Sequence, residues 1–106
     1  MKTTLTLAFG LVALASSVAV HAAEDPGLKL ANENACMTCH AIDHKVIGPP
    51  FHAIAQRFRN QPQAAAYLLA RLQHGSTGDW GNTTMPPNAQ SSAHDLQQLV
   101  QWVLAQ

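Results

Sequence analysis

Charged residues are scarce in this sequence: the 106 residues include six Lys plus Arg and six Asp plus Glu, 11% of the chain. A protein that binds duplex nucleic acid carries a basic stripe or patch, and this balanced composition offers none. There are only two cysteines, which excludes a framework of several disulfides. A bond between Cys36 and Cys39 would close a loop of a few residues and would stabilise the fold little. Something other than disulfides must therefore support a small core.

Long apolar runs are also lacking, except at the beginning of the chain. Lys2 comes before the run LTLAFGLVALASSVAV, and small residues follow in VHAA. This pattern is typical of a secretory signal peptide; the alternative, a membrane anchor, needs about 20 apolar residues, and the run is short for that. We expect residues 1–22 to be cleaved, with the cut after Ala22 or Ala23. A single domain of residues 23–106, with no membrane span, would then be exported in soluble form to the periplasm.

Apolar spacing in the rest of the chain predicts helices. Asp25 followed by Pro26 is a start signal for a short helix over about residues 26–35. A second helix is predicted from FHAIAQRF, with Phe51, Ile54, Ala55 and Phe58 on one face. Asn60 and Pro62 would open a third helix that stops at Gly75. A fourth would follow Ser91 or Ser92, with its apolar face formed by Leu96, Leu99, Val100, Val103 and Leu104.

Residues 75–90, GSTGDWGNTTMPPNAQ, have no helical period and are rich in glycine, proline and polar residues. We expect a loop here, and a loop this long in a small domain is usually functional. No alternating pattern of a strand is evident anywhere in the chain. The predicted fold class is therefore all-α, with about four helices.

The two cysteines lie in CMTCH, residues 36–40, and this motif has three possible chemistries. A thioredoxin-like redox pair belongs beside a βαβ unit, and no strands are predicted here. A structural zinc site needs four nitrogen or sulfur ligands, and there is no second CxxC. The third chemistry is covalent attachment of haem c, which CxxCH behind a signal peptide favours most strongly. Cys36 and Cys39 would form the thioethers, and His40 would bind the iron.

A haem iron bound by one protein ligand can bind small molecules, whereas an iron with two strong ligands mainly transfers electrons. The candidates for a second ligand are Met37, Met85, Lys29, Lys45, His44, His52, His74 and His94. Met37, His44 and Lys45 are tethered close to His40, and the other histidines stand singly on helices. Met85 stands in the long loop before two prolines that restrict its backbone. A thioether opposite histidine raises the reduction potential, and we expect Met85 to be that ligand.

The segments CMTCHAID, IGPPF, HGSTGDWG, MPPNA and WVLAQ, in this order, resemble the class I c-type cytochromes, especially the small bacterial cytochrome c-551 type. The resemblance extends from EDP to the end of the chain. It implies a compact helical fold around one covalent haem and single-electron transfer in the periplasm. The rival class is an enzyme or gas sensor with an open iron site.

The resemblance also implies roles for individual residues. The carbonyl of Pro49 would accept the second ring N–H of His40, and Asn88 would lie near the sulfur of Met85. Arg71 and Trp80 would bind a haem propionate. We expect a monomer that exchanges electrons with redox proteins such as a nitrite reductase, a terminal oxidase, a cytochrome c peroxidase or a membrane cytochrome complex.

Lysines are few, where relatives often surround the exposed haem edge with them. Strong charge complementarity with a partner is therefore not expected. We expect docking instead through an apolar patch of Met37, Val46, Ile47, Pro86 and Pro87.

Overall fold

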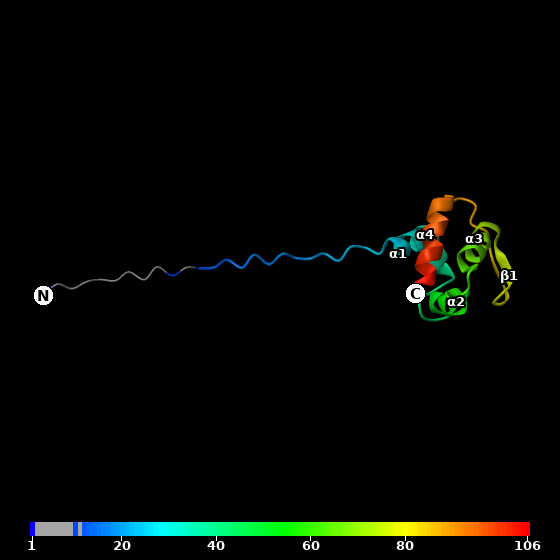
Figure 1. The fold of residues 1–106 in the computed structure, drawn as a ribbon, viewed down its shortest axis with the longest axis horizontal. Helices are drawn as coiled ribbons and strands as arrows, with labels where there is room; N and C mark the ends of the chain where they lie inside the picture. The colour runs from blue at the N-terminus through cyan, green and yellow to red at the C-terminus, as the bar shows by residue number, and fades with distance from the viewer. Residues whose placement is uncertain (2–9, 11) are drawn as a thin grey trace.

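The structure, a computed structural model, describes residue 1, residue 10 and residues 12–106 (Figure 1). Residues 12–24 contain no helix or strand, and their trace leads away from the folded part of the chain. The expected signal segment, residues 1–22, thus lies partly outside the described residues. Among the helices that are described, none is long and apolar enough to cross a membrane.

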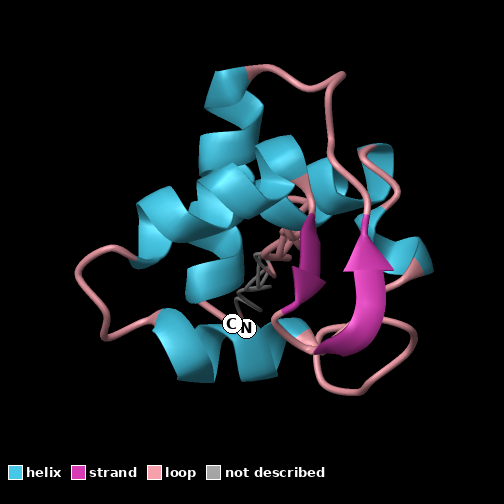
Figure 2. Cartoon of the chain, turned by 90° about the vertical axis from the view of Figure 1, so that its right-hand side faces the viewer, coloured by secondary structure: helices cyan, strands magenta, loops and turns pink. Residues whose placement is uncertain are grey.

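Four α-helices form the folded part: α1 (Pro26–Glu33), α2 (Phe51–Phe58), α3 (Ala64–His74) and α4 (Ala93–Leu104). A short 3₁₀ turn, η1 (Cys36–Thr38), follows α1. The strands β1 (Ser76–Gly78) and β2 (Gly81–Met85) lie side by side between α3 and α4 in the chain (Figure 2). The expected all-α class with about four helices is confirmed, with a small hairpin in addition.

The first and last helices pack at very short range. Asp25 caps α1, and its carboxylate accepts hydrogen bonds from the amides of Gly27 and Leu28. The indole N–H of Trp102 in α4 donates to the same carboxylate at 2.9 Å. A Cβ on Gly27 would lie 2.1 Å from the indole ring of Trp102, so only glycine permits this approach. The predicted start signal therefore also joins the two ends of the domain.

The core is formed by the faces that apolar spacing predicted. All four predicted residues of the α2 face are buried: Phe51, Ile54, Ala55 and Phe58. On α4 the buried side chains are Leu96, Leu99 and Val100, and Ala31 of α1 is fully buried against this helix. Val103 and Leu104 are only partly buried. Ser92 caps α4 by accepting a hydrogen bond from the amide of Asp95, as predicted.

The expectation of a loop without strands over residues 75–90 is wrong. Ser76 pairs with Met85 and Thr77 with Thr84 in an antiparallel hairpin, and the register is irregular after Thr77. Glycines at positive φ, 90° at Gly78 and 97° at Gly81, permit the reversal of the chain. The sequence does contain a weak indication of this hairpin, because β-branched threonines stand on both sides of a glycine-containing turn. The strands are too short and too exposed to show apolar alternation.

The start of α3 also differs from the prediction. Asn60 and Pro62 do not open the helix, because residues 59–63 form turns and the first helical residue is Ala64. Local bonds hold these turns: the amide of Gln61 donates to Phe58, and that of Ala64 donates to Gln61. The predicted end is correct, because Gly75 follows α3 at a φ of 81°.

Candidate cofactor site

The attachment motif begins directly after α1. Ala35 has a φ of 58°, which turns the chain from α1 into η1. The amide of His40 donates to the carbonyl of Cys36 at 2.9 Å, so Cys36, Cys39 and His40 belong to one tight turn. Both cysteines are partly buried, and burial raises the pKa of the Cys36 thiol. The turn thus presents two thiols and an imidazole together.

His40 is held on three sides. Its Nδ1 lies 2.7 Å from the carbonyl oxygen of Pro49, which can only accept, so Nδ1 must donate. Its ring stacks on Phe51, with centroids 5.0 Å apart and planes 19° from parallel. A Cβ on Gly48 would lie 2.7 Å from Cε1 of His40. With Nδ1 engaged, Nε2 is the nitrogen available for a ligand bond.

Three cavities are lined by both His40 and Met85, and Arg71 also lines two of them, a larger one of about 340 Å³ and a smaller one of about 70 Å³. Cys39 lines the larger cavity and Cys36 the smaller one. Apolar side chains of three helices complete the smaller cavity: Phe51, Ile54, Leu68, Leu72, Leu99, Val100 and Val103. Apolar walls, an imidazole, a thioether and a guanidinium fit a flat apolar macrocycle that carries iron and carboxylates.

Met85 ends strand β2 and pairs with Ser76. The two prolines after it and the close approach of Gly75, where a Cβ would lie 2.7 Å from the Met85 carbonyl oxygen, fix the exit of the strand. Among the other ligand candidates, the side chains of Lys29, His44, His52, His74 and His94 lie on exposed residues that line neither cavity. Lys45 lines the larger cavity, but its backbone is bridged to His40.

Arg71 and Trp80 both line the larger cavity, from α3 and from the hairpin turn. The Nε of Arg71 is buried and has no hydrogen-bond partner among the residues that the structure describes. A buried donor of this kind needs an acceptor, and a haem carboxylate at this position would supply one. Trp80 is 37% exposed, and the Arg57 guanidinium stacks on its ring at 4.8 Å.

Asn88 lies beyond Met85 and forms bonds in three directions. Its amide N–H donates to the carbonyl of Leu72 at 2.7 Å, and its side-chain oxygen accepts from the amide of Ser91. Its side-chain N–H donates to Oδ1 of Asn34 at 2.9 Å, and the Ser91 hydroxyl donates to the same oxygen. The resemblance implied a position near the Met85 sulfur. In the structure, the bonds of Asn88 attach the methionine loop to α3 and to Asn34, the residue that follows α1.

Several residues that shape the site carried no recognised signal in the sequence. Gly48 and Phe51 contact the ring of His40, although the sequence pattern indicates only a helix break at Gly48 and a core position at Phe51. Asn34, two residues before the motif, accepts hydrogen bonds from Asn88 and Ser91, but nothing in the sequence pattern distinguishes it from other polar residues. Tyr67 and Asp79 meet at the wall of the larger cavity. Only tertiary contact reveals these roles.

Comparisons with known proteins show the family of this chain. Residues 24–106 match the family model for cytochrome c. The chain is 45% identical over 84 residues to cytochrome c-551 of Pseudomonas aeruginosa, covering 79% of each chain. It is 38% identical to cytochrome c-551 of Azotobacter vinelandii, covering 76% of this chain and 96% of that one.

Among solved structures, the crystal structure of Nitrosomonas europaea cytochrome c552 is similar, with a TM-score of 0.71 and 38% identity. The match covers 74% of this chain and 96% of that chain. The similarity thus includes almost the whole of the relative's fold. The chain therefore belongs to the cytochrome c family, holds one covalently attached haem c, and is an electron-transfer protein rather than an enzyme.

Proposed function

We propose that this protein is a periplasmic single-electron carrier in which His40 and Met85 would hold the haem iron. Cys36 and Cys39 form the thioethers. The haem supplies the one-electron chemistry of its iron when it is bound. The protein supplies the ligands, the apolar enclosure and the charges around it.

The observation that carries this proposal is that His40 and Met85 line the same three cavities from different parts of the chain. The hydrogen bond from Nδ1 of His40 to Pro49 orients the ring and increases its basicity as a ligand. Met85 follows the hairpin and precedes two prolines, so its sulfur is directed by a constrained backbone. Two fixed ligands leave little rearrangement between oxidation states, which suits rapid electron transfer.

The remaining residues of the site support the ligands. The buried Nε of Arg71 lacks a partner within the described part of the chain, and we propose that it donates to a haem propionate, with Trp80 beside it. Asn88 holds the methionine loop through its bonds to Leu72 and Asn34. Through these bonds it keeps Met85 close to the iron.

Replacing Met85 tests this ligand assignment. Met85→Ala should abolish the thioether–iron charge-transfer absorption band of the oxidised protein and allow rapid carbon monoxide binding by the reduced protein. Met37→Ala, which changes the methionine inside the attachment turn, should leave both properties as in the wild type. If Met85→Ala leaves the spectrum unchanged, Met85 is not the ligand. If the wild-type protein itself binds carbon monoxide rapidly, the iron site is open.

The proposed location follows from the amino-terminal segment. Its positive start, short apolar core and small-residue exit favour export with cleavage after Ala22 or Ala23. Mass spectrometry of the purified holoprotein should find a chain that begins at Ala23 or Glu24. A holoprotein that retains residues 1–22 would contradict this.

We propose a nitrite reductase, a terminal oxidase, a cytochrome c peroxidase or a membrane cytochrome complex as the redox partners. Val46 and Ile47 are 47% and 52% exposed beside the histidine ligand, and Pro86 and Pro87 are exposed beside Met85. Met37 is partly buried. An apolar docking patch predicts that electron-transfer rates with a partner change little with ionic strength, and a steep fall would point to charge instead.

A further inference from the structure

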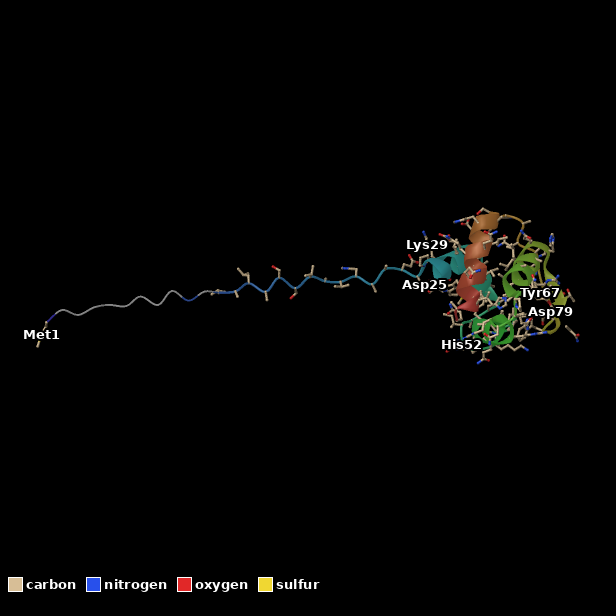
Figure 3. All side chains as sticks on the ribbon, viewed as in Figure 1. Met1, Asp25, Lys29, His52, Tyr67 and Asp79 are labelled. Atoms are coloured by element: carbon tan, nitrogen blue, oxygen red, sulfur yellow. The ribbon has the colours of Figure 1, made fainter. Side chains whose placement is uncertain are left out.

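The hairpin turn places one carboxylate at the wall of the larger cavity. Asp79 lies between β1 and β2 and is partly buried, and Figure 3 shows it beside Tyr67 of α3. The Tyr67 hydroxyl donates to Oδ2 of Asp79 at 2.7 Å, and the Ser76 hydroxyl donates to the same oxygen at 2.7 Å. The Arg57 guanidinium donates at 2.8 Å to the backbone carbonyl of Asp79. The carboxylate is thus held in one position from α2, α3 and β1.

The charged groups around Asp79 come from each neighbouring element. Arg57 of α2 stacks on Trp80, and Arg71 of α3 lies 5.1 Å from the ring centroid of Tyr67. Lys45 lines the same cavity from the segment after His40. The hairpin itself, residues 76–85, contains no charged residue other than Asp79. Asp79 is therefore the one anion that the hairpin contributes to a corner with two guanidinium groups.

Hydroxyl groups, rather than a direct ion pair, stabilise this carboxylate. Hydrogen bonds from Tyr67 and Ser76 lower the pKa of Asp79, and the bond to Asp79 raises the pKa of Tyr67. Asp79 is therefore ionised and Tyr67 neutral near neutral pH. Neutral dipoles favour the charge without cancelling it, so its field still extends into the cavity. A guanidinium bound directly to the carboxylate would have neutralised much of that field.

We propose that Asp79 sets the reduction potential, as a fixed negative charge that favours the oxidised state of the haem. The inference rests on the proposed function. Reduction adds one electron to the iron, with no bond formed or broken, and makes the cofactor one charge more negative. A nearby carboxylate opposes that change, and removing its charge favours the reduced state.

The test compares potentials of holoprotein variants at neutral pH. Asp79→Asn keeps the size and an acceptor oxygen but removes the charge, and should shift the potential upward. Asp79→Glu should bring it back toward the wild-type value. Asp95→Asn in α4, a carboxylate that lines neither cavity, is the matched control and should leave the potential unchanged. The charge-transfer band should persist in every variant.

Acid titration gives a second readout. As the pH falls, protonation of Asp79 removes the same charge, so the wild-type potential should rise in the acid range. The propionate carboxylates titrate in both proteins, so Asp79→Asn should show a smaller rise than the wild type. Tyr67→Phe removes one hydroxyl donor and weakens the stabilisation of the carboxylate. The rise should then begin at a higher pH than in the wild type.

The results separate this inference from the ligand assignment. Equal potentials for Asp79→Asn and wild type, or no recovery with Asp79→Glu, would overturn the role of Asp79. A potential shift that accompanies loss of the charge-transfer band would also overturn it, since the effect would then be on Met85. If Asp79→Asn does not fold, an unchanged acid titration in Tyr67→Phe would decide against the proposal. Absence of the band from the wild-type protein would instead contradict His/Met ligation itself.

Discussion

The histidine side of the haem site, residues 36–58, differs from the methionine side, residues 75–92, in how the proposed ligand is held. His40 is 8% exposed, and its partner Pro49 lies only nine residues along the chain. Met85 is partly exposed and ends a strand whose other residues are exposed. The loop after it is bound through Asn88 to Asn34, 54 residues away.

This difference separates local from long-range positioning. On the histidine side, a turn, a glycine and the start of α2 are close in sequence and determine where the imidazole lies. On the methionine side, the position depends on contacts with α1, α2 and α3, which exist only after the helices have packed. We expect the methionine side to open at a lower free energy than the histidine side. The following changes test this, from the largest expected effect to the smallest.

Phe51→Ala should have the largest effect, because Phe51 is 4% exposed and stacks on His40. Removing a buried phenylalanine lowers the free energy of unfolding by about 3–5 kcal/mol. Urea unfolding of the holoprotein measures this. Val46→Ala, on the exposed segment nearby, should change it by less than about 0.5 kcal/mol. Similar losses for the two variants would show that the histidine side does not depend on this packing.

Gly48→Ala should have the next largest effect. The new Cβ would lie 2.7 Å from Cε1 of a ring that Phe51 confines on another side. We expect a loss of about 1–3 kcal/mol, as for overpacking in a core. Pro49→Ala is the matched control, because it retains the carbonyl that accepts from His40. The expectation fails if Gly48→Ala is as stable as Pro49→Ala.

Asn34→Ala tests the methionine side. It removes the acceptor of Asn88 and Ser91, and should cost about 1–2 kcal/mol, since two donors lose their partner. The methionine loop should open more often, so the reduced protein should bind carbon monoxide faster than the wild type. Asn32→Ala, which changes an exposed asparagine of α1 whose side chain donates to the carbonyl of Leu28, should leave that rate unchanged. Equal rates for Asn34→Ala and wild type would mean that Asn34 does not restrain the loop.

The smallest effect should come from Asp25, which belongs to neither side. The indole N–H of Trp102, then the amides of Gly27 and Leu28, lower the pKa of Asp25 below its usual value. Its contribution to stability is therefore present above the pKa of an unfolded aspartate and is lost as the pH falls through the folded pKa. Asp25→Asn should make the free energy of unfolding fall less steeply as the pH is lowered. The same substitution should have a smaller effect in a Trp102→Phe background, where the indole hydrogen bond is already absent. Neither change should alter the charge-transfer band. Parallel acid curves for Asp25→Asn and wild type would contradict this.

The helices were predictable because their determinants are local. The spacing of Phe51, Ile54, Ala55 and Phe58 predicted the buried face of α2, and Ser92 caps α4 as expected. Asp25 and Pro26 begin α1. In each case a few neighbouring residues specify the element, so the sequence pattern suffices.

The hairpin was not predictable in the same way. Its strands are short and mostly exposed, so no apolar alternation marks them. Thr77 and Thr84 favour extended backbone only weakly, and the strands form because they also pair with each other. The predicted helix start at residues 60–63 was wrong for a similar reason. The amide of Gln61 donates to the carbonyl of Phe58 in the preceding helix, and this bond holds a turn there.

The sequence by itself determined the helical class, the attachment motif at residues 36–40 and the candidacy of Met85. These depend on short-range patterns: helical spacing, CxxCH and a methionine followed by two prolines. Only the tertiary structure decided that Gly48 and Phe51 enclose His40, that Asn34 receives Asn88, and that Tyr67 meets Asp79. Each of these contacts joins side chains whose separation depends on how turns and helices pack. No sequence pattern encodes that distance directly.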